Sequence, residues 1–407
     1  MLSKFCLPLI LAITLSASGQ YKNDNVFYRT VDPADLCATL EKNKGYILLD
    51  VRSPGEYADT SDSPSYNLGH FKGARNIEVR DLGKRLSELQ DYKNKAVFVY
   101  CSHSQRSRRA SKMLADSGFS KVFNINGGMT AIHYTDARDK GCLQSLVETA
   151  NSYEIISANE LCKKQRIKDK KVFVLDVRPD SAFRHISRET KENAMGVIRG
   201  SVNIPLADLA GRLTEVTKGR AEIVVTDIYG DEAAKAAVLL KQHGYRKVSI
   251  LIEGVDRILN TDVRNLPCRN ELYVSPLAYQ TITVSEFGRY AKENNHYTLL
   301  DVRPAEEFTN KHKDYWRNIG HIKGAINLPV ADISNRYSEL DKNNDILIYA
   351  FGSGKDPFEA ANFLQKLGYK KLKVIYGGVF NMRWAAGNVK GRSYLKDMVV
   401  DIPEINQ

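Results

Sequence analysis

The sequence repeats one pattern three times, and this internal repeat constrains the fold more than any other feature. An apolar run ending in Asp-Val-Arg appears as GYILLDVRSPGEY, KVFVLDVRPDSAF and HYTLLDVRPAEEF, at 45–57, 171–183 and 296–308. A second pattern follows each copy as GHFKGARNI, GVIRGSVNI and GHIKGAINL, at 69–77, 196–204 and 320–328. The copies lie too far apart for a solenoid, so each is expected to be a domain of ordinary size.

Within each copy, apolar runs of four or five residues alternate with amphipathic stretches such as RRASKMLADSGF. This alternation predicts α/β domains, each a small doubly wound parallel sheet flanked by helices. We expect the domains at 27–148, 152–272 and 279–398, with polar linkers at about 149–153 and 273–281.

The N-terminus has the pattern of a secretory signal. MLSK gives a cationic start, FCLPLILAITL an apolar run and SASGQ a small-residue stretch suited to cleavage. Cys6 lies inside the apolar run, so lipid attachment is not expected. We expect residues 1–19 to be removed, leaving a secreted or periplasmic protein without stable membrane insertion, in an oxidising compartment.

The net charge of +11 suits anionic partners. The basic residues are spread along the chain, however, and no groove-reading motif accompanies them, so no nucleic-acid partner is expected. No ligand cluster has metal spacing, so neither a metal nor an organic cofactor is expected.

The stretch YCSHSQRSRRAS, which begins at Tyr100, contains the main candidate for chemistry. Cys101 lies at the carboxyl end of a predicted central strand, and open α/β sheets bind ligands at the carboxyl ends of their strands. Backbone N–H groups of the loop and the start of the next helix would stabilise a thiolate, the nucleophilic form. Arg106 would grip an oxyanion, and Ser107 would cap the helix. The remaining candidate loop residues are Ser102, His103, Ser104 and Gln105.

The equivalent loops of the second and third copies lack the cysteine. DIYGDEA places Asp227 at the cysteine position and Glu232 at the arginine position, and such an acidic loop would repel an anion. AFGSGKDPF places Ala350 at the cysteine position. Gly352, Gly354 and Lys355 of that loop could still form an anion-binding nest.

The Asp-x-Arg pairs serve as an internal control. Asp50 and Arg52 have counterparts in both copies that lack the loop cysteine, namely Asp176/Arg178 and Asp301/Arg303. We therefore expect a structural Asp–Arg brace at a strand end, not a catalytic pair. For the same reason His70 and His321 are expected to be packing residues.

Together, these motifs resemble the rhodanese (thiosulfate sulfurtransferase-like) family over nearly the whole mature chain, as three tandem domains. The resemblance implies a five-stranded parallel sheet in each domain. It also implies that the C-x4-R loop from Cys101 to Arg106 fits a persulfide, whereas phosphatases of this fold use C-x5-R. The implied reaction is ping-pong: Cys101 takes sulfane sulfur from an anionic donor such as thiosulfate and passes it to cyanide or a thiol.

Several features depart from the family pattern. Family loops often have Arg where Ser102 stands and Gly where Ser104 stands, so weaker anion binding and a less regular loop are expected. Arg108 and Arg109 are expected to face solvent, although either could replace the missing charge. The active domain is usually the last of the tandem and is the first here.

Two other hypotheses remain open. The chain could be a non-enzymatic binding module with a vestigial Cys101, since two of the three copies are inactive. It could also be a thiol-redox protein, although no CxxC supports that. Copies two and three would be structural or would wall the active-site entrance, and no protein partner can be identified.

The remaining cysteines of the mature chain occupy equivalent positions in copies one and two. Cys37 and Cys162 lie in the first predicted helix, and Cys142 and Cys268 lie in the domain tail. Copy three has Gly288 in its helix and no tail cysteine. This joint pattern predicts the disulfides Cys37–Cys142 and Cys162–Cys268, with four unpaired buried cysteines as the alternative.

Overall fold

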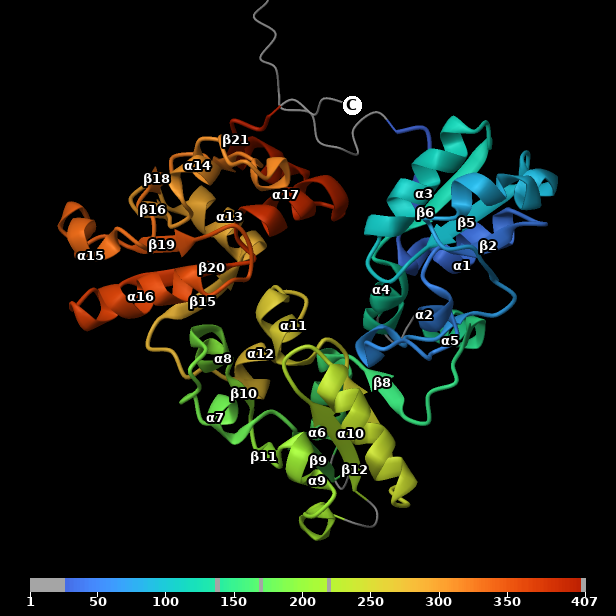
Figure 1. The fold of residues 1–407 in the computed structure, drawn as a ribbon, viewed down its shortest axis with the longest axis horizontal. Helices are drawn as coiled ribbons and strands as arrows, with labels where there is room; N and C mark the ends of the chain where they lie inside the picture. Colours follow the sequence, from blue (N-terminus) through green and yellow to red (C-terminus); the bar gives the residue numbers. More distant parts are fainter. Residues whose placement is uncertain (1–25, 136–139, 168–170, 218–220, 404–407) are drawn as a thin grey trace, which may run out of the picture.

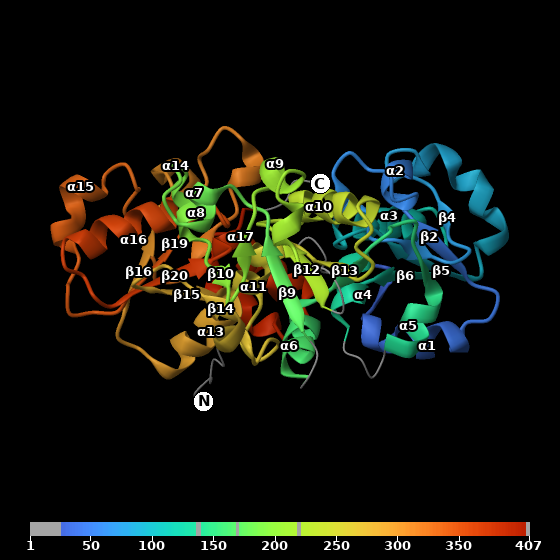
Figure 2. The same ribbon diagram turned by 90° about the horizontal axis from the view of Figure 1, so that it is seen from below.

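The computed structural model describes residues 26–135, 140–167, 171–217 and 221–403. The expected signal segment at 1–19 lies outside the described residues. Three α/β domains follow one another along the chain and form three lobes, with the second at the bottom of Figure 1, between the third at the upper left and the first at the upper right (Figures 1 and 2). In the described ranges, no helix is both long and apolar enough to cross a membrane.

Each domain contains the predicted five-stranded parallel sheet, and the strand order is the same in all three. In the first domain the order is β1 (Arg29–Val31), β6 (Lys121–Ile125), β5 (Ala96–Tyr100), β2 (Ile47–Asp50) and β4 (Arg75–Asn76). In the second it is β8 (Glu154–Ile156), β13 (Val248–Leu251), β12 (Glu222–Thr226), β9 (Val172–Asp176) and β11 (Val202–Asn203). In the third it is β15 (Gln280–Thr283), β20 (Leu372–Tyr376), β19 (Ile346–Tyr349), β16 (Thr298–Asp301) and β18 (Ile326–Asn327).

Helices cover both faces of each sheet. The first domain has α1 (Pro33–Lys42), α2 (Pro54–Tyr57), α3 (Gln105–Asp116), α4 (Gly128–Tyr134) and α5 (Lys140–Leu146), with 3-10 helices η1 (Pro64–Tyr66) and η2 (Leu82–Tyr92). The second has α6 (Ala158–Arg166), α7 (Asp180–Phe183), α8 (Thr190–Ala194), α9 (Leu206–Leu209), α10 (Asp231–Gln242), α11 (Gly254–Asn260) and α12 (Arg269–Leu272), with η3 (Leu213–Glu215). The third has α13 (Val284–Glu293), α14 (Ala305–Phe308), α15 (Ile333–Arg336), α16 (Asp356–Lys366) and α17 (Gly378–Asn388), with η4 (Tyr315–Arg317), η5 (Tyr337–Glu339) and η6 (Ser393–Met398).

The central strand β5 shows why the domain has two cores. It is buried at every position. Since successive side chains of a strand point to opposite faces, Val97 and Val99 pack with the apolar side of α3. Phe98 and Tyr100 instead pack with Leu36 of α1 on the other face. The run is therefore apolar throughout rather than alternating, as expected of a doubly wound parallel sheet.

In each domain, a short antiparallel ribbon pairs the domain's tail with the start of the second repeated pattern, which begins at Gly69, Gly196 or Gly320. The three ribbons are β3 (His70–Phe71) with β7 (Val147–Glu148), β10 (Val197–Ile198) with β14 (Tyr273–Val274), and β17 (His321–Ile322) with β21 (Val399–Val400). The second and third units therefore reach Val274 and Val400, beyond the ends expected at 272 and 398. Residues 273–274 belong to a strand and not to the expected linker.

Both predicted disulfides are present. Cys37 of α1 is bonded to Cys142 of α5, and Cys162 of α6 to Cys268, which precedes α12. In the third domain the tail packs directly on the first helix: a Cβ added at Gly288 would lie 2.7 Å from Leu395 Cδ2. Direct packing thus takes the place of a disulfide there.

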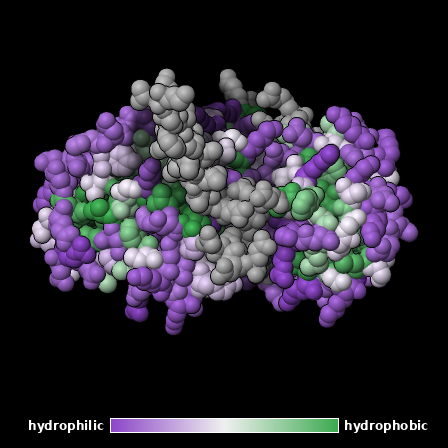
Figure 3. All heavy atoms as spheres, turned by 90° about the horizontal axis from the view of Figure 1, so that it is seen from above, coloured by the Kyte–Doolittle hydropathy of each residue, from purple (hydrophilic) through white to green (hydrophobic). Residues whose placement is uncertain are grey.

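The domains are joined by polar and apolar contacts. One hydrophobic cluster runs from the second domain into the third, and the Asn126 side chain of the first domain donates to the Asn388 carbonyl of the third at 3.0 Å. Figure 3 shows one face of the molecule, on which hydrophilic residues dominate the periphery and hydrophobic residues gather in patches between them.

Candidate active site

Cys101 directly follows the central strand β5 and lies before α3. Its side chain is only 1% exposed and lies at a pocket of about 330 Å³. The pocket brings together five of the seven predicted loop residues with side chains from the segment before β3. It is lined by Glu56, Ser61, Ser63, Tyr66, Cys101, Ser102, His103, Gln105 and Arg106.

Ser104 adopts a left-handed backbone conformation, which favours glycine, the residue that family loops often have at this position. Its φ is 79°, in the left-handed region, at the N-cap of α3. The Ser104 hydroxyl accepts a hydrogen bond from the Gly127 N–H and donates to the Ile125 carbonyl at 3.3 Å. These bonds offset the cost of a left-handed L-residue, so the expectation of a less regular loop does not hold for the backbone.

Ser107 does not cap the helix, contrary to expectation. Ser104 occupies the N-cap, and Ser107 lies in the first turn of α3. There it contacts the nucleophile: the Cys101 thiol donates to Ser107 Oγ at 3.6 Å. Ser107 in turn donates to Asn124 Oδ1 at 2.6 Å. Because a hydroxyl can rotate, Ser107 could also turn its proton toward a thiolate.

Arg106 is paired with a carboxylate that the sequence reasoning missed. Its guanidinium donates to both oxygens of Glu56, at 2.5 and 2.6 Å, and to Ser102 Oγ at 2.8 Å. Burial alone raises the pKa of Glu56, but hydrogen bonds from Arg106 and Ser53 outweigh it and lower the pKa. Arg106 therefore meets the pocket as part of an ion pair. The sequence did contain a sign of the position of Glu56: the capping box Ser53-x-x-Glu56, which holds this carboxylate at the start of α2.

Neither neighbouring arginine replaces a missing charge in the pocket. Arg108 is buried and donates to Asn126 Oδ1 at 2.9 Å, so the expectation that it faces solvent is wrong. Its position follows from the turn of the helix, which directs residue 108 toward the end of β6. Arg109 is exposed, as expected.

The equivalent loop of the second domain holds an anion of its own. The Asp227 carboxylate accepts hydrogen bonds from the backbone N–H groups of Gly230, Glu232 (2.7 Å) and Ala233 (3.2 Å). Burial raises the pKa of Asp227 to about 6, although these backbone hydrogen bonds oppose the rise. Gly230 caps α10 with a left-handed φ of 104°, just as Ser104 caps α3.

The third loop offers no group for sulfur chemistry. Ala350 stands at the cysteine position, and Lys355 is paired with Glu359 of the following helix turn at 3.0 Å. Gly352 and Gly354 do not take the left-handed conformation. An anion-binding nest at this loop therefore stays a prediction.

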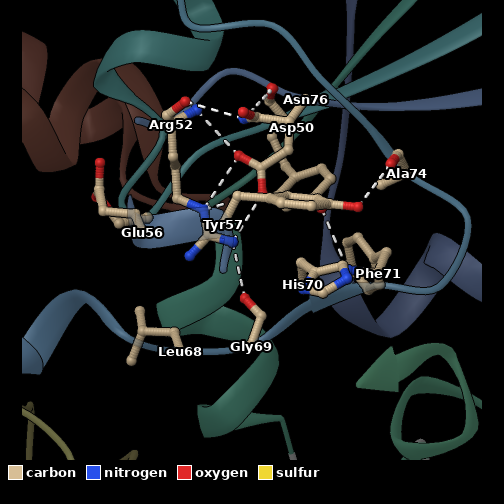
Figure 4. Close-up of polar contacts among 12 residues, drawn as sticks. Asp50, Arg52, Glu56, Tyr57, Leu68, Gly69, His70, Phe71, Ala74 and Asn76 are labelled. Carbon is tan, nitrogen blue, oxygen red and sulfur yellow. Dashed lines mark hydrogen bonds and ion pairs between the residues drawn. The ribbon is translucent and has the colours of Figure 1, made fainter. Parts of the chain in front are cut away.

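The Asp-x-Arg pair has one geometry in all three domains. Arg52 binds the Asp50 carboxylate through Nε and Nη2 and donates to the Gly69 carbonyl at 2.7 Å (Figure 4). Asp50 lies beside Tyr100, immediately before the nucleophile, in the register of β2 with β5. The matching bonds join Arg178 to Asp176 and the Gly196 carbonyl, and Arg303 to Asp301 and the Gly320 carbonyl.

His70 and His321 also have matching surroundings. The ring of His70 lies 4.0 Å from that of Tyr57, and the ring of His321 lies 4.2 Å from that of Phe308. Neither histidine lines the Cys101 pocket. Among the described residues, no group of three or more His, Cys, Asp or Glu side chains could hold a metal ion.

Comparison with known proteins places the fold and the repeat in a family. The rhodanese-like domain model matches residues 32–135, 159–261 and 283–383. Uncharacterized protein YqhL of Bacillus subtilis is 37% identical over 81 residues, which are 20% of this chain and 56% of YqhL. A tRNA uridine(34) hydroxylase of Cronobacter sakazakii is 30% identical over 123 residues, 29% of this chain and 34% of that protein.

The chain thus spans about half the length of YqhL and about a third of the hydroxylase. A solved structure of thiosulfate sulfurtransferase from Pseudomonas aeruginosa aligns with 85% of this chain and 66% of that chain, at 16% identity and a TM-score of 0.23. At a coarse level, the family match supports sulfur transfer as the chemistry of the fold. The chain belongs to the rhodanese family and carries three rhodanese-like domains in tandem.

Proposed function

We propose that the protein is an exported sulfurtransferase that carries sulfane sulfur as a persulfide on Cys101. The donor is an anionic sulfur compound such as thiosulfate, and the acceptor is a thiol or cyanide. The observation that carries the proposal is the Asp227 loop, which holds a carboxylate with three backbone N–H groups. Export rests on the N-terminal signal pattern alone.

The Asp227 loop indicates what the Cys101 loop can hold. Both loops follow the central strand, pass through a left-handed cap and enter a long helix. The counterparts of the three donating N–H groups belong to Ser104, Arg106 and Ser107. With a sulfur in place of the carboxylate, these groups would stabilise a thiolate or a persulfide anion.

The transfer balances without an external oxidant or reductant. The Cys101 thiolate attacks the sulfane sulfur of thiosulfate, the new S–S bond forms, and sulfite leaves with the electron pair of the old one. The acceptor then attacks the outer sulfur of the persulfide. That S–S bond breaks and the Cys101 thiolate returns.

The cysteine inventory favours transfer over a thiol-redox role. The other four cysteines of the described chain are paired in the two disulfides, so Cys101 is the one free thiol there. A redox cycle needs a resolving thiol, and a persulfide cycle does not.

The test is turnover of the purified mature protein with thiosulfate and other sulfane donors, using cyanide and small thiols as acceptors. We expect product to form and Cys101→Ser to abolish it, with an unchanged melting temperature for the variant. If no donor supports turnover in the wild type, the non-enzymatic binding module becomes the better hypothesis.

A further inference from the structure

A hydrogen bond between two domains reaches the wall of the Cys101 pocket. His103 lines the pocket and is 43% exposed. Its Nε2 lies 2.8 Å from Glu253 Oε1 of the second domain and 3.2 Å from Thr130 Oγ1 of α4. The second domain therefore supplies a carboxylate to a residue of the first domain's active loop.

Glu253 occupies a backbone position that favours glycine. It caps α11 with a left-handed φ of 55°. The same cap before α4 and before α17 is Gly127 (φ 74°) and Gly377 (φ 85°). An L-residue is strained there. The two sister domains avoid this strain, and the second domain accepts it while placing a carboxylate against His103.

The charge of Glu253 fixes the tautomer of His103. Burial alone raises the pKa of Glu253, but the charge of Arg257 and the hydrogen bond to His103 outweigh it and lower the pKa. An ionised carboxylate can only accept, so Nε2 of His103 carries the proton. The lone pair of the neutral ring is then on Nδ1, where it can accept a proton.

The interface around this contact is well braced. The Arg257 guanidinium lies 3.5 Å from Glu253 Oε2 and 4.4 Å from the ring centre of Tyr134 in α4. Tyr134 donates to the Ile252 carbonyl at 3.0 Å. Next to the pocket residue Tyr66, the Ser65 N–H donates to Asp231 Oδ1 at 2.9 Å. The second domain thus contacts the first at His103 and at Ser65, beside the pocket residue Tyr66.

We infer that the second domain completes the active site of the first, with Glu253 as a positioning residue that acts through His103 on the acceptor half-reaction. This inference rests on the proposed function. Loading starts from the Cys101 thiolate, whose proton has been released to solvent, and the sulfite that leaves needs no proton, so this step requires no general base beyond the groups that stabilise the thiolate. An acceptor thiol is largely protonated at neutral pH, because a free thiol has a pKa of about 8.5, and it must lose its proton to attack.

The acceptor step is balanced as follows. His103 Nδ1 takes the proton of the acceptor thiol R–SH, and the thiolate attacks the outer sulfur of the Cys101 persulfide. A bond forms between the acceptor sulfur and the outer sulfur, which gives the persulfide R–S–S⁻. The bond from Cys101 Sγ to the outer sulfur breaks, and its electron pair stays on Cys101. The proton on His103 is released to solvent, and there is no net oxidation or reduction.

The test separates the two half-reactions by mass spectrometry of Cys101. Glu253→Gly, which copies the sister domains, should load sulfur within about twofold of wild type and unload it to a thiol about tenfold more slowly at pH 7. Glu253→Gln should be intermediate, because its amide oxygen still accepts from Nε2. Raising the pH toward the thiol's own pKa should restore the unloading rate of both variants, a result that a merely structural role would not give.

The groups that face His103 and could shape this pH profile lie on several elements. They are Glu253, which caps α11, Arg257 of α11, Tyr66 of η1, Glu56 of α2, Cys101 of the loop and Arg106 of α3. A matched control is Glu215→Gln, which breaks the exposed ion pair with Arg212 in the same domain and should change neither half-reaction.

The melting temperature of Glu253→Gly should stay close to that of wild type, since the relief of left-handed strain offsets the lost contacts with His103 and Arg257. Equal unloading rates and pH profiles in wild type and Glu253→Gly would overturn the inference while leaving the sulfurtransferase proposal intact. If the wild type acquires no sulfur from any donor, the proposed function fails, and the inference fails with it.

Discussion

The Cys101 loop and the Asp227 loop have nearly the same backbone and different chemistry. In both, a buried group at the end of the central strand precedes a left-handed cap and a helix. In the second domain that group is a carboxylate with three backbone donors. In the first it is a thiol whose side-chain partner is Ser107. The two domains therefore share the left-handed cap at this loop, and we expect the residue at the strand end to decide whether a reactive sulfur can be held.

The surrounding charges differ as well. The first domain pairs Arg106 with Glu56, whereas the second has Glu232 and Ala182 at these positions. Burial raises the pKa of Glu232. The second loop thus contains its own anion and an added acidic group, and both oppose the entry of a second anion.

The largest expected effect is a loss of stability on breaking the Asp-x-Arg pair, which the two domains share. Arg52→Met and Arg178→Met each leave a fully buried aspartate without its partner, which costs about 3–5 kcal/mol. Because the brace is structural, the free energy of unfolding measured in urea should fall by a similar amount in both variants. An Arg178→Met variant that keeps the stability of wild type would contradict a structural brace common to the two domains. Arg212→Ala, at an exposed ion pair, should leave the free energy of unfolding nearly unchanged.

The second prediction concerns the anion that only the second domain holds. The pKa of Asp227 in the folded protein, about 6, lies above that of an unfolded aspartate. The folded state therefore binds this proton more tightly, and the contribution of Asp227 to the free energy of unfolding rises as the pH falls through 6 toward 4. Wild type should gain about 2 kcal/mol relative to Asp227→Asn between pH 7 and pH 4. Parallel pH profiles of the two proteins would contradict the raised pKa.

A smaller effect is expected from Ser107→Ala, which gives the first loop the alanine that the second has at Ala233. Loss of the hydroxyl partner of Cys101 should cost about 1 kcal/mol of thiolate stabilisation, or roughly a fivefold slower loading of sulfur. The measurement is the rate of the mass increase after addition of donor. An unchanged rate would mean that the backbone N–H groups suffice without the hydroxyl.

The smallest effect should come from Ser104→Gly, which gives the first loop the cap residue of the second. Glycine relieves the left-handed strain but loses the hydrogen bonds to Gly127 and Ile125, and these changes oppose each other. The loading rate should stay within about threefold of wild type, because each change is about 1 kcal/mol. A tenfold gain in rate would show that Ser104 impairs the cradle.

The features that could be predicted from the sequence are those that the copies share. The parallel sheets follow from three matching apolar patterns, and both disulfides follow from cysteines that are present or absent together. The expected cap at Ser107 was wrong because a helix start is set by loop geometry, which the residue types do not fix to one position. The role of Glu56 was missed because its partner Arg106 is distant in sequence, although the capping box marked its place.

The contact of His103 with Glu253 could not be predicted, since it depends on how two domains pack. One signal was nevertheless visible: the second copy reads Glu253-Gly254 where its sisters read Gly-Gly at 127–128 and 377–378. A substitution at a position that favours glycine suggests that the side chain has a use. Its partner could be identified only in three dimensions.

The most direct test of the sulfur-carrying role of Cys101 is peptide mass spectrometry of the protein after treatment with thiosulfate. A gain of one sulfur atom, about 32 Da, is expected on the peptide that contains Cys101. It should be lost on addition of cyanide or a thiol and should not occur at any other residue. A wild-type protein that stays unmodified with every sulfane donor, or that carries the added sulfur elsewhere, would contradict the role assigned to Cys101.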